Sequence, residues 1–172
     1  KTDLARIRGD YIFNDGGRHK YFKFKNADDC VVRAIAIVRE MDYKEVLHEI
    51  TDYCLQYGAP FSSKLIIEKY MEATGAIKHK VKHPKGRKAR PKDLPNGRWI
   101  TSMAHHLSAV INKVPHDLWD TSDRMVYTYW GYPKKLKGGE DHEEFALLQM
   151  GEEVVRRLGG VGGRSGGGLG KA

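Results

Sequence analysis

Residues 28–38 have the sequence DDCVVRAIAIV, in which a single arginine interrupts an otherwise apolar run. Aspartate is a favoured helix N-cap, so the pattern predicts a helix that begins at about Cys30. A helix that is apolar on most faces is a buried one. Because the N–H groups and the dipole at a helix start stabilise a thiolate, Cys30 is a candidate nucleophile. The carboxylates of Asp28 and Asp29 oppose this, since nearby negative charge raises the pKa of a thiol.

Two more helices are predicted after this run. They span residues 42–58 and 62–75, and Asp42 is the expected N-cap of the first. Gly58 fits the position just past the end of that helix, where a left-handed residue is favoured. Cys54 falls on the apolar stripe of the same helix and is interpreted as a small core residue.

Beyond residue 98 the spacing of apolar residues changes from a helical period to alternation, which is typical of strands. The predicted strands span residues 99–103, 107–111, 114–118 and 125–130. Asn112 and Lys113 form the predicted two-residue turn of a hairpin. Helices followed by strands indicate an α+β domain. We expect the N-terminal helices, including the one that starts at Cys30, to pack on a C-terminal antiparallel sheet.

The predicted hairpin brings a histidine and an aspartate together. With a two-residue turn at residues 112–113, positions 106 and 117 share one side of the sheet, diagonal to each other. His106 and Asp117 are therefore expected to act as a base and the carboxylate that orients it. Asp120 falls on the other face and is the alternative orienter if a bulge shifts the register by one residue. A shift of the same size makes His105 the alternative base.

Cysteine chemistry on a carbonyl also needs hydrogen-bond donors for the oxyanion. The backbone N–H of Cys30 is one candidate, and Asn26, the only amide side chain shortly before it, is the other. No cofactor is expected. A zinc site that uses Cys30 with His105, His106 or His116 is a further alternative, although the spacing matches no usual ligand pattern.

A basic segment lies between the helical and strand-rich parts of the chain. It runs from Lys78 to Arg98 and holds nine lysines and arginines against one acid, Asp93. Three prolines within it are expected to exclude regular structure. The plain interpretation is a solvated loop. The alternative is a contact surface for nucleic acid or an acidic partner, with binding driven by counterion release.

The length of 172 residues fits one domain, which we expect to cover residues 1–158. Near its start, residues 15–17 predict a turn and residues 21–24 a short extended segment. A last helix is predicted over residues 141–158. Residues 159–172 are rich in glycine and predict a flexible tail.

Composition limits the compartment and the partners. Two cysteines cannot form a disulfide framework, which favours a reducing compartment. No apolar run approaches the roughly 20 residues of a membrane span. The expected location is therefore the cytoplasm, with no membrane partner.

Two blocks of sequence carry a resemblance to a known family, and it extends over most of residues 20–132. The first block is residues 26–36; the second consists of residues 97–100, 106–111, 116–120 and 127–130. They resemble a papain-like family of small bacteriophage-encoded proteins and, more loosely, the double-glycine peptidases. The resemblance implies a papain-like fold with Cys30 as nucleophile, His106 as base and Asp117 as orienter. It also implies a phage-encoded protein of the bacterial host cytoplasm or the virion.

Two functions follow as hypotheses. The first is a cysteine-dependent hydrolase, a peptidase or an isopeptidase or amidase, that acts on a peptide or protein through a Cys-His-Asp triad. The second is a catalytically weak or inactive papain-like binding protein, whose basic segment contacts nucleic acid or an acidic partner.

Overall fold

The structure is a computed structural model, and it describes residues 7–8, 10–23 and 28–133. Asn26, the predicted last helix and the Gly-rich tail lie outside the described residues. The chain divides into two compact units, and all described residues belong to the first, which ends at Pro133.

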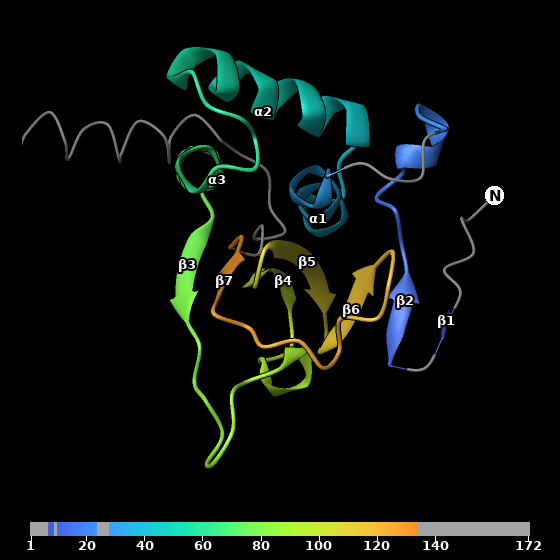
Figure 1. The fold of residues 1–172 in the computed structure, drawn as a ribbon, viewed down its shortest axis with the longest axis vertical. Coiled ribbons are helices and arrows are strands. Elements are labelled where there is room, and N and C mark those ends of the chain that lie inside the picture. Colours follow the sequence, from blue (N-terminus) through green and yellow to red (C-terminus); the bar gives the residue numbers. More distant parts are fainter. Residues whose placement is uncertain (1–6, 9, 24–27, 134–172) are drawn as a thin grey trace, which may run out of the picture. The chain divides into compact units, whose positions relative to one another are not determined.

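A seven-stranded mixed sheet forms one layer of the unit (Figure 1). Its strands are β1 (Ile7–Arg8), β2 (Tyr11–Phe13), β3 (Ile77–Lys80), β4 (Arg98–Met103), β5 (His106–Ile111), β6 (Val114–Asp117) and β7 (Thr128–Gly131). They lie in the order β1-β2-β6-β5-β4-β7-β3. The predicted α+β class is confirmed. The predicted all-antiparallel sheet is wrong at one place, because β2 pairs with β6 in parallel.

The order of elements also differs from the simple sequence of helices followed by strands. β1 and β2 precede the first helix, and β3 follows the third. Their sequence signals are weak because each strand is short and lies at or beside an edge of the sheet, with little apolar alternation. The fourth predicted strand starts later than expected, at Thr128. The N–H groups of Val126 and Tyr127 instead bond to the carbonyls of Ala89 and Ser102.

Three helices pack on the sheet: α1 (Cys30–Arg39), α2 (Tyr43–Tyr57) and α3 (Lys64–Ala73). Every residue of α1 from Val31 to Val38 is buried, as the continuous apolar run predicts. The N-cap of α2 is Asp42, whose carboxylate accepts the N–H of Lys44, and Gly58 ends the helix at φ 63°. Figure 1 shows α1 between the sheet and α2.

The main core lies between these helices and one face of the sheet. Ile35 of α1, Ile50 of α2 and Ile66 of α3 are fully buried there, together with Ile100 and Ala109 of the sheet. Cys54 is only half-buried, but it packs against this core as predicted. No helix among the described residues is long and apolar enough to cross a membrane.

The opposite face of the sheet is covered by part of the basic segment. Val110 points there because side chains alternate along β5, and it packs with Leu94, Met103 and Val126 in a second, smaller cluster. The segment contains regular structure, contrary to prediction: strand β3 and a 3₁₀ turn, η2 (Pro91–Asp93). Proline is compatible with η2 because it occupies the first turn, where its missing N–H costs nothing.

The predicted turn at residues 15–17 is present and leads into a 3₁₀ helix, η1 (Arg18–Lys20). Of the predicted extended segment, residues 21–23 belong to no strand and Phe24 lies outside the described residues. The Asp15 carboxylate accepts the N–H groups of Gly17 and His19, which favours a helical turn over an extended strand.

Candidate active site

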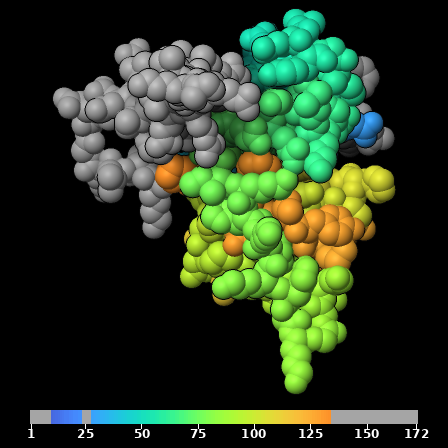
Figure 2. Space-filling model, turned by 90° about the vertical axis from the view of Figure 1, so that its left-hand side faces the viewer, coloured from blue at the N-terminus to red at the C-terminus, as the bar shows by residue number. Residues whose placement is uncertain are grey.

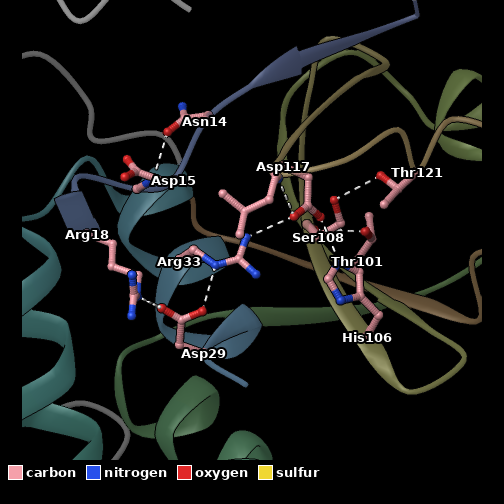
Figure 3. A network of polar contacts seen from close by, with 12 residues as sticks. Asn14, Asp15, Arg18, Asp29, Arg33, Thr101, His106, Ser108, Asp117 and Thr121 are labelled. Atoms are coloured by element: carbon pink, nitrogen blue, oxygen red, sulfur yellow. Dashed lines mark hydrogen bonds and ion pairs between the residues drawn. The ribbon is translucent and has the colours of Figure 1, made fainter. Parts of the chain in front are cut away.

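The site forms where the start of α1 meets the open end of the β5–β6 hairpin. Cys30 is the first residue of α1, His106 the first of β5 and Asp117 the last of β6. The hairpin pairs Ile111 with Val114 and Ala109 with His116, which is the register predicted from a two-residue turn. That register brings the His106 and Asp117 side chains together, as Figure 3 shows.

His106 joins the other two side chains. Its Nε2 lies 2.7 Å from Oδ2 of Asp117, and its ring also hydrogen-bonds the Cys30 sulfur. Burial lowers the pKa of His106, but the bonds to Asp117 and Cys30 outweigh this and raise it from 6.5 to about 9. The imidazole is therefore a cation at neutral pH.

Cys30 has the complementary shift. Burial raises its pKa, whereas hydrogen bonds from His106 and from the backbone N–H of Leu107 lower it, with help from the charges of His106 and Arg33. The net pKa lies below the ordinary thiol value. A lowered cysteine pKa beside a raised histidine pKa favours a thiolate–imidazolium pair, which is the reactive form of a cysteine nucleophile.

Asp117 is 1% exposed, and both of its carboxylate oxygens have hydrogen-bond partners. Besides His106, its carboxylate accepts the Leu118 N–H at 2.8 Å and Nη1 of Arg33 at 2.9 Å, and it also bonds Ser108. Burial raises its pKa, but His106 first, then Ser108 and the charge of Arg33, hold the pKa below 3.8. The group is thus a buried carboxylate, and its contacts fix which oxygen faces the imidazole.

Asp29, the acid next to Cys30, is also paired with positively charged side chains. Asp29 is 5% exposed and its carboxylate meets Nε of Arg33, Nε of Arg18 and the hydroxyl of Tyr43, each at 2.8 Å. It occupies the N-cap position of α1 but makes no capping bond with its side chain, contrary to expectation. A charge-assisted hydrogen bond from Arg33 and an ion pair with Arg18 take the place of the weaker cap. The two guanidinium groups thus offset the negative charge of Asp29 beside a Cys30 thiolate.

The alternative residues lie elsewhere. Asp120 is exposed and accepts the N–H of Ser122, so the alternative orienter is not at the imidazole. His105, the alternative base, is exposed in the β4–β5 turn at φ 53°. Asn26, the oxyanion candidate, lies outside the described residues.

Several contributing residues were missed by the sequence argument. Arg33 had a signal, as the one cation in an apolar run and one turn after Cys30. Trp119 had none: its ring lies 5.1 Å from the His106 ring, centroid to centroid, and is 41% exposed at the rim of the site. Arg124 lies over the Trp119 ring, with its guanidinium carbon 5.6 Å from the ring centroid.

A metal centre finds no support in the part of the chain that the structure describes. No group of three or more histidine, cysteine, aspartate or glutamate side chains there is arranged to hold an ion. His116, one of the zinc alternatives, has burial and the charge of Arg98 lowering its pKa.

The chain matches no protein-family model, and it is significantly similar to no curated protein and to no solved structure. The papain-like resemblance is therefore carried by the sequence motifs alone and stays a prediction.

Proposed function

We propose that the protein is a cysteine-dependent hydrolase of papain-like type, with Cys30 as nucleophile, His106 as proton carrier and Asp117 as orienter. The observation that carries the proposal is the continuous chain of contacts from the Cys30 sulfur through the imidazole to a buried carboxylate. A second support is the pair of opposed pKa shifts at Cys30 and His106. Perturbed pKa values in one cluster are typical of catalytic sites.

The reaction uses these groups in turn. The Cys30 thiolate attacks the carbonyl carbon of an amide, and the electron pair of the C=O bond moves to oxygen. The C–N bond then breaks as the His106 imidazolium gives its proton to the leaving nitrogen. Water next attacks the thioester while neutral His106 accepts a proton from it. The C–S bond breaks, which releases the acid and restores the thiolate–imidazolium pair.

The start of α1 supplies part of the electrostatics. The first N–H groups of a helix have no intrahelical acceptor and point outward, so the backbone N–H of Cys30 is available to a developing oxyanion. Asn26 remains the candidate for the second donor. A peptide, isopeptide or side-chain amide would fit this chemistry equally, and a phage-encoded enzyme of the host cytoplasm or the virion is the proposed biological setting.

The test is selective labelling of the full chain with a peptidyl probe that carries a thiol-reactive Michael acceptor. We expect Cys30 to be modified much faster than Cys54, whose thiol pKa is raised by burial. His106→Ala should abolish this preference, whereas the matched change His105→Ala should leave it intact. Equal, slow labelling of both cysteines in the unsubstituted protein would sink the proposal.

A second candidate function is binding of a polyanion by the basic segment, residues 78–98. Figure 2 shows part of this segment projecting from the rest of the unit. Its only acid, Asp93, forms a two-point contact with Arg87, at 2.6 and 2.7 Å. Lys80, Lys82 and Lys85 are exposed, as is Lys88, so the segment offers positive charge to solvent.

The test of this candidate is the fluorescence anisotropy of a labelled DNA duplex, titrated with the protein at salt concentrations from about 50 to about 200 mM. Binding should weaken steeply with salt and should be lost when the four exposed lysines are changed to serine. Changing four exposed lysines elsewhere, at positions 44, 64, 69 and 113, gives the same net charge and should have little effect. Equal losses in both variants would reduce the segment to a solvated loop.

A further inference from the structure

Arg33 is the residue that connects the two halves of the site. It is 5% exposed, and its guanidinium spans two carboxylates: Nε donates to Asp29 at 2.8 Å and Nη1 donates to Asp117 at 2.9 Å. Figure 3 shows it reaching from α1 toward the carboxylate that faces His106. Asp117 is 84 residues away along the chain, so this contact fastens the helix that carries Cys30 to the hairpin that carries the base.

The two carboxylates depend on Arg33 to different degrees. Asp29 keeps an ion pair with Arg18 and a hydrogen bond from Tyr43 if Arg33 is removed. Asp117 has Arg33 as its one guanidinium partner among the described residues, and the two contacts divide its oxygens: Oδ1 goes to Arg33 and Oδ2 to His106. Arg33 therefore matters more for the position of the Asp117 carboxylate than for that of Asp29.

We propose that Arg33 is a positioning residue of the active site, which holds Asp117 so that Oδ2 faces the His106 imidazole and holds α1 so that Cys30 meets the same ring. The inference rests on the proposed hydrolase function. Arginine suits the role because its planar fork donates to two carboxylates at once from a fixed geometry, which a lysine cannot do.

The charged groups that face Arg33 come from every element packed against it. Arg33 itself pairs with Asp29, the N-cap of α1, and with Asp117 at the end of β6, and its charge acts on Cys30 of α1. Arg18 of η1 and Tyr43 of α2 contact Asp29, and His106 of β5 contacts Asp117. Removing Arg33 takes away a cation that lowers the pKa of both Cys30 and Asp117, and it releases Asp117 from its position. Both effects favour the neutral thiol over the thiolate.

The test follows the pH dependence of Cys30 alkylation by iodoacetamide, in the full chain with Cys54→Ala so that one thiol remains. Only the thiolate reacts, so the midpoint of the rate profile reports the pKa of Cys30. For Arg33→Met we expect the midpoint to rise by about one pH unit, which slows alkylation about tenfold well below it. Arg33→Lys, which keeps the charge but not the fork, should show a smaller rise.

Arg39→Met is the matched control, because Arg39 is on the same helix and its guanidinium is likewise paired, with Glu49 at 2.7 Å. Its midpoint should equal that of the unsubstituted protein. The inference is overturned if Arg33→Met, folded by circular dichroism, has the midpoint of Arg39→Met. It is equally overturned if Arg33→Lys keeps the unsubstituted midpoint, and this outcome decides the matter should Arg33→Met fail to fold.

A double-mutant cycle shows whether Arg33 acts through Asp117. In that case Arg33→Met should shift the midpoint much less in an Asp117→Asn background than alone, whereas independent effects would add. The outcomes also separate this inference from the proposed function. If the midpoint is that of an ordinary thiol and His106→Ala leaves it unchanged, the proposed function is wrong. If the midpoint is low and responds to His106→Ala but not to Arg33→Met, only the proposed role of Arg33 is wrong.

Discussion

Asp117 is the side chain on which the charges of the site converge. It is buried at the end of β6 and meets a guanidinium on one oxygen and an imidazole on the other. A buried carboxylate of this kind is stable only while its partners are present, because an unpaired buried charge costs several kcal/mol. At the scale of the residue, the site is a set of charges that compensate one another.

The first prediction concerns the two aspartates proposed as orienters. Asp117→Asn removes the buried anion that pairs with Arg33 and His106, so we expect the free energy of unfolding to fall by about 3 kcal/mol. Asp120→Asn alters an exposed residue and should change it little. Urea unfolding at pH 7 measures both, and a similar cost for the two variants would contradict the buried network.

The second prediction concerns the pH dependence of stability. The folded pKa of His106 is raised above its unfolded value of 6.5, so its stabilisation is full below pH 6.5 and is lost as pH rises through the folded value, about 9. In the Cys30→Ser variant, where no thiol titrates at this position, Asp117 still raises the His106 pKa. We expect stability to fall by at least about 1 kcal/mol between pH 6 and pH 9.

His106→Gln added to Cys30→Ser is the control for that experiment. It removes the titrating group, so the difference in unfolding free energy between pH 6 and pH 9 should shrink. A fall of the same size in both variants would assign the pH dependence to other groups.

At the scale of elements, the hairpin turn fixes the site, because its register decides that positions 106 and 117 share a side. The turn residues Asn112 and Lys113 both have positive φ, at 48° and 74°, which suits a two-residue turn but is unfavourable for a lysine. Asn112 also closes the turn onto the start of β4, since its Oδ1 accepts the N–H of Gly97 at 3.1 Å.

The third prediction follows from that strain. Lys113→Gly should raise the free energy of unfolding by about 0.5 to 1 kcal/mol, because glycine adopts positive φ without a steric cost. Lys113→Ala removes the same charged side chain but keeps the Cβ, so it should give no such gain. Chemical denaturation of the two variants distinguishes backbone strain from the loss of the lysine charge.

How far the sequence foretells these elements depends on the range of the contacts involved. The start of α1 and the pairing of His106 with Asp117 follow from local signals: a cap, an apolar run and a turn of known length. The parallel pairing of β2 with β6 and the Arg33–Asp117 contact do not, because both join segments about 80 to 100 residues apart and no local pattern encodes them. The 3₁₀ turn within the basic segment was not predicted, because three prolines argue against regular structure and the packing that favours the turn cannot be read from the sequence.

At the scale of the described unit, the N-terminal segment supports the site from the edge of the sheet. β2 pairs with β6, and the N–H of Asn14 donates to the carbonyl of Asp117 at 3.0 Å. Gly16, at φ 66°, packs so closely on α1 that a Cβ there would lie 3.1 Å from the carbonyl oxygen of Arg33. Residues 10–20 therefore contact both the proposed orienter and the helix that carries the proposed nucleophile.

The fourth prediction tests this support. Deleting residues 1–20 should leave the protein folded, since the main core is built from α1–α3 and the central strands. It should expose the edge of β6, so amide hydrogen exchange in β6 should accelerate while that in β3, at the opposite edge, stays unchanged. Uniform acceleration in both strands would show general destabilisation instead.

Trp119 beside His106 gives the site an optical signal. An imidazolium close to an excited indole accepts an electron from it, which dims the emission, whereas neutral imidazole does so far less. Because the two rings lie 5.1 Å apart and His106 has a pKa of about 9, tryptophan emission should brighten as pH rises through that value.

His106→Ala should abolish this brightening, and so should Trp119→Phe, which leaves Trp99 and Trp130 as background emitters. An unchanged pH response in Trp119→Phe would place the responding indole elsewhere. The charge on the proposed catalytic histidine can thus be followed in solution by light alone, before any substrate is known.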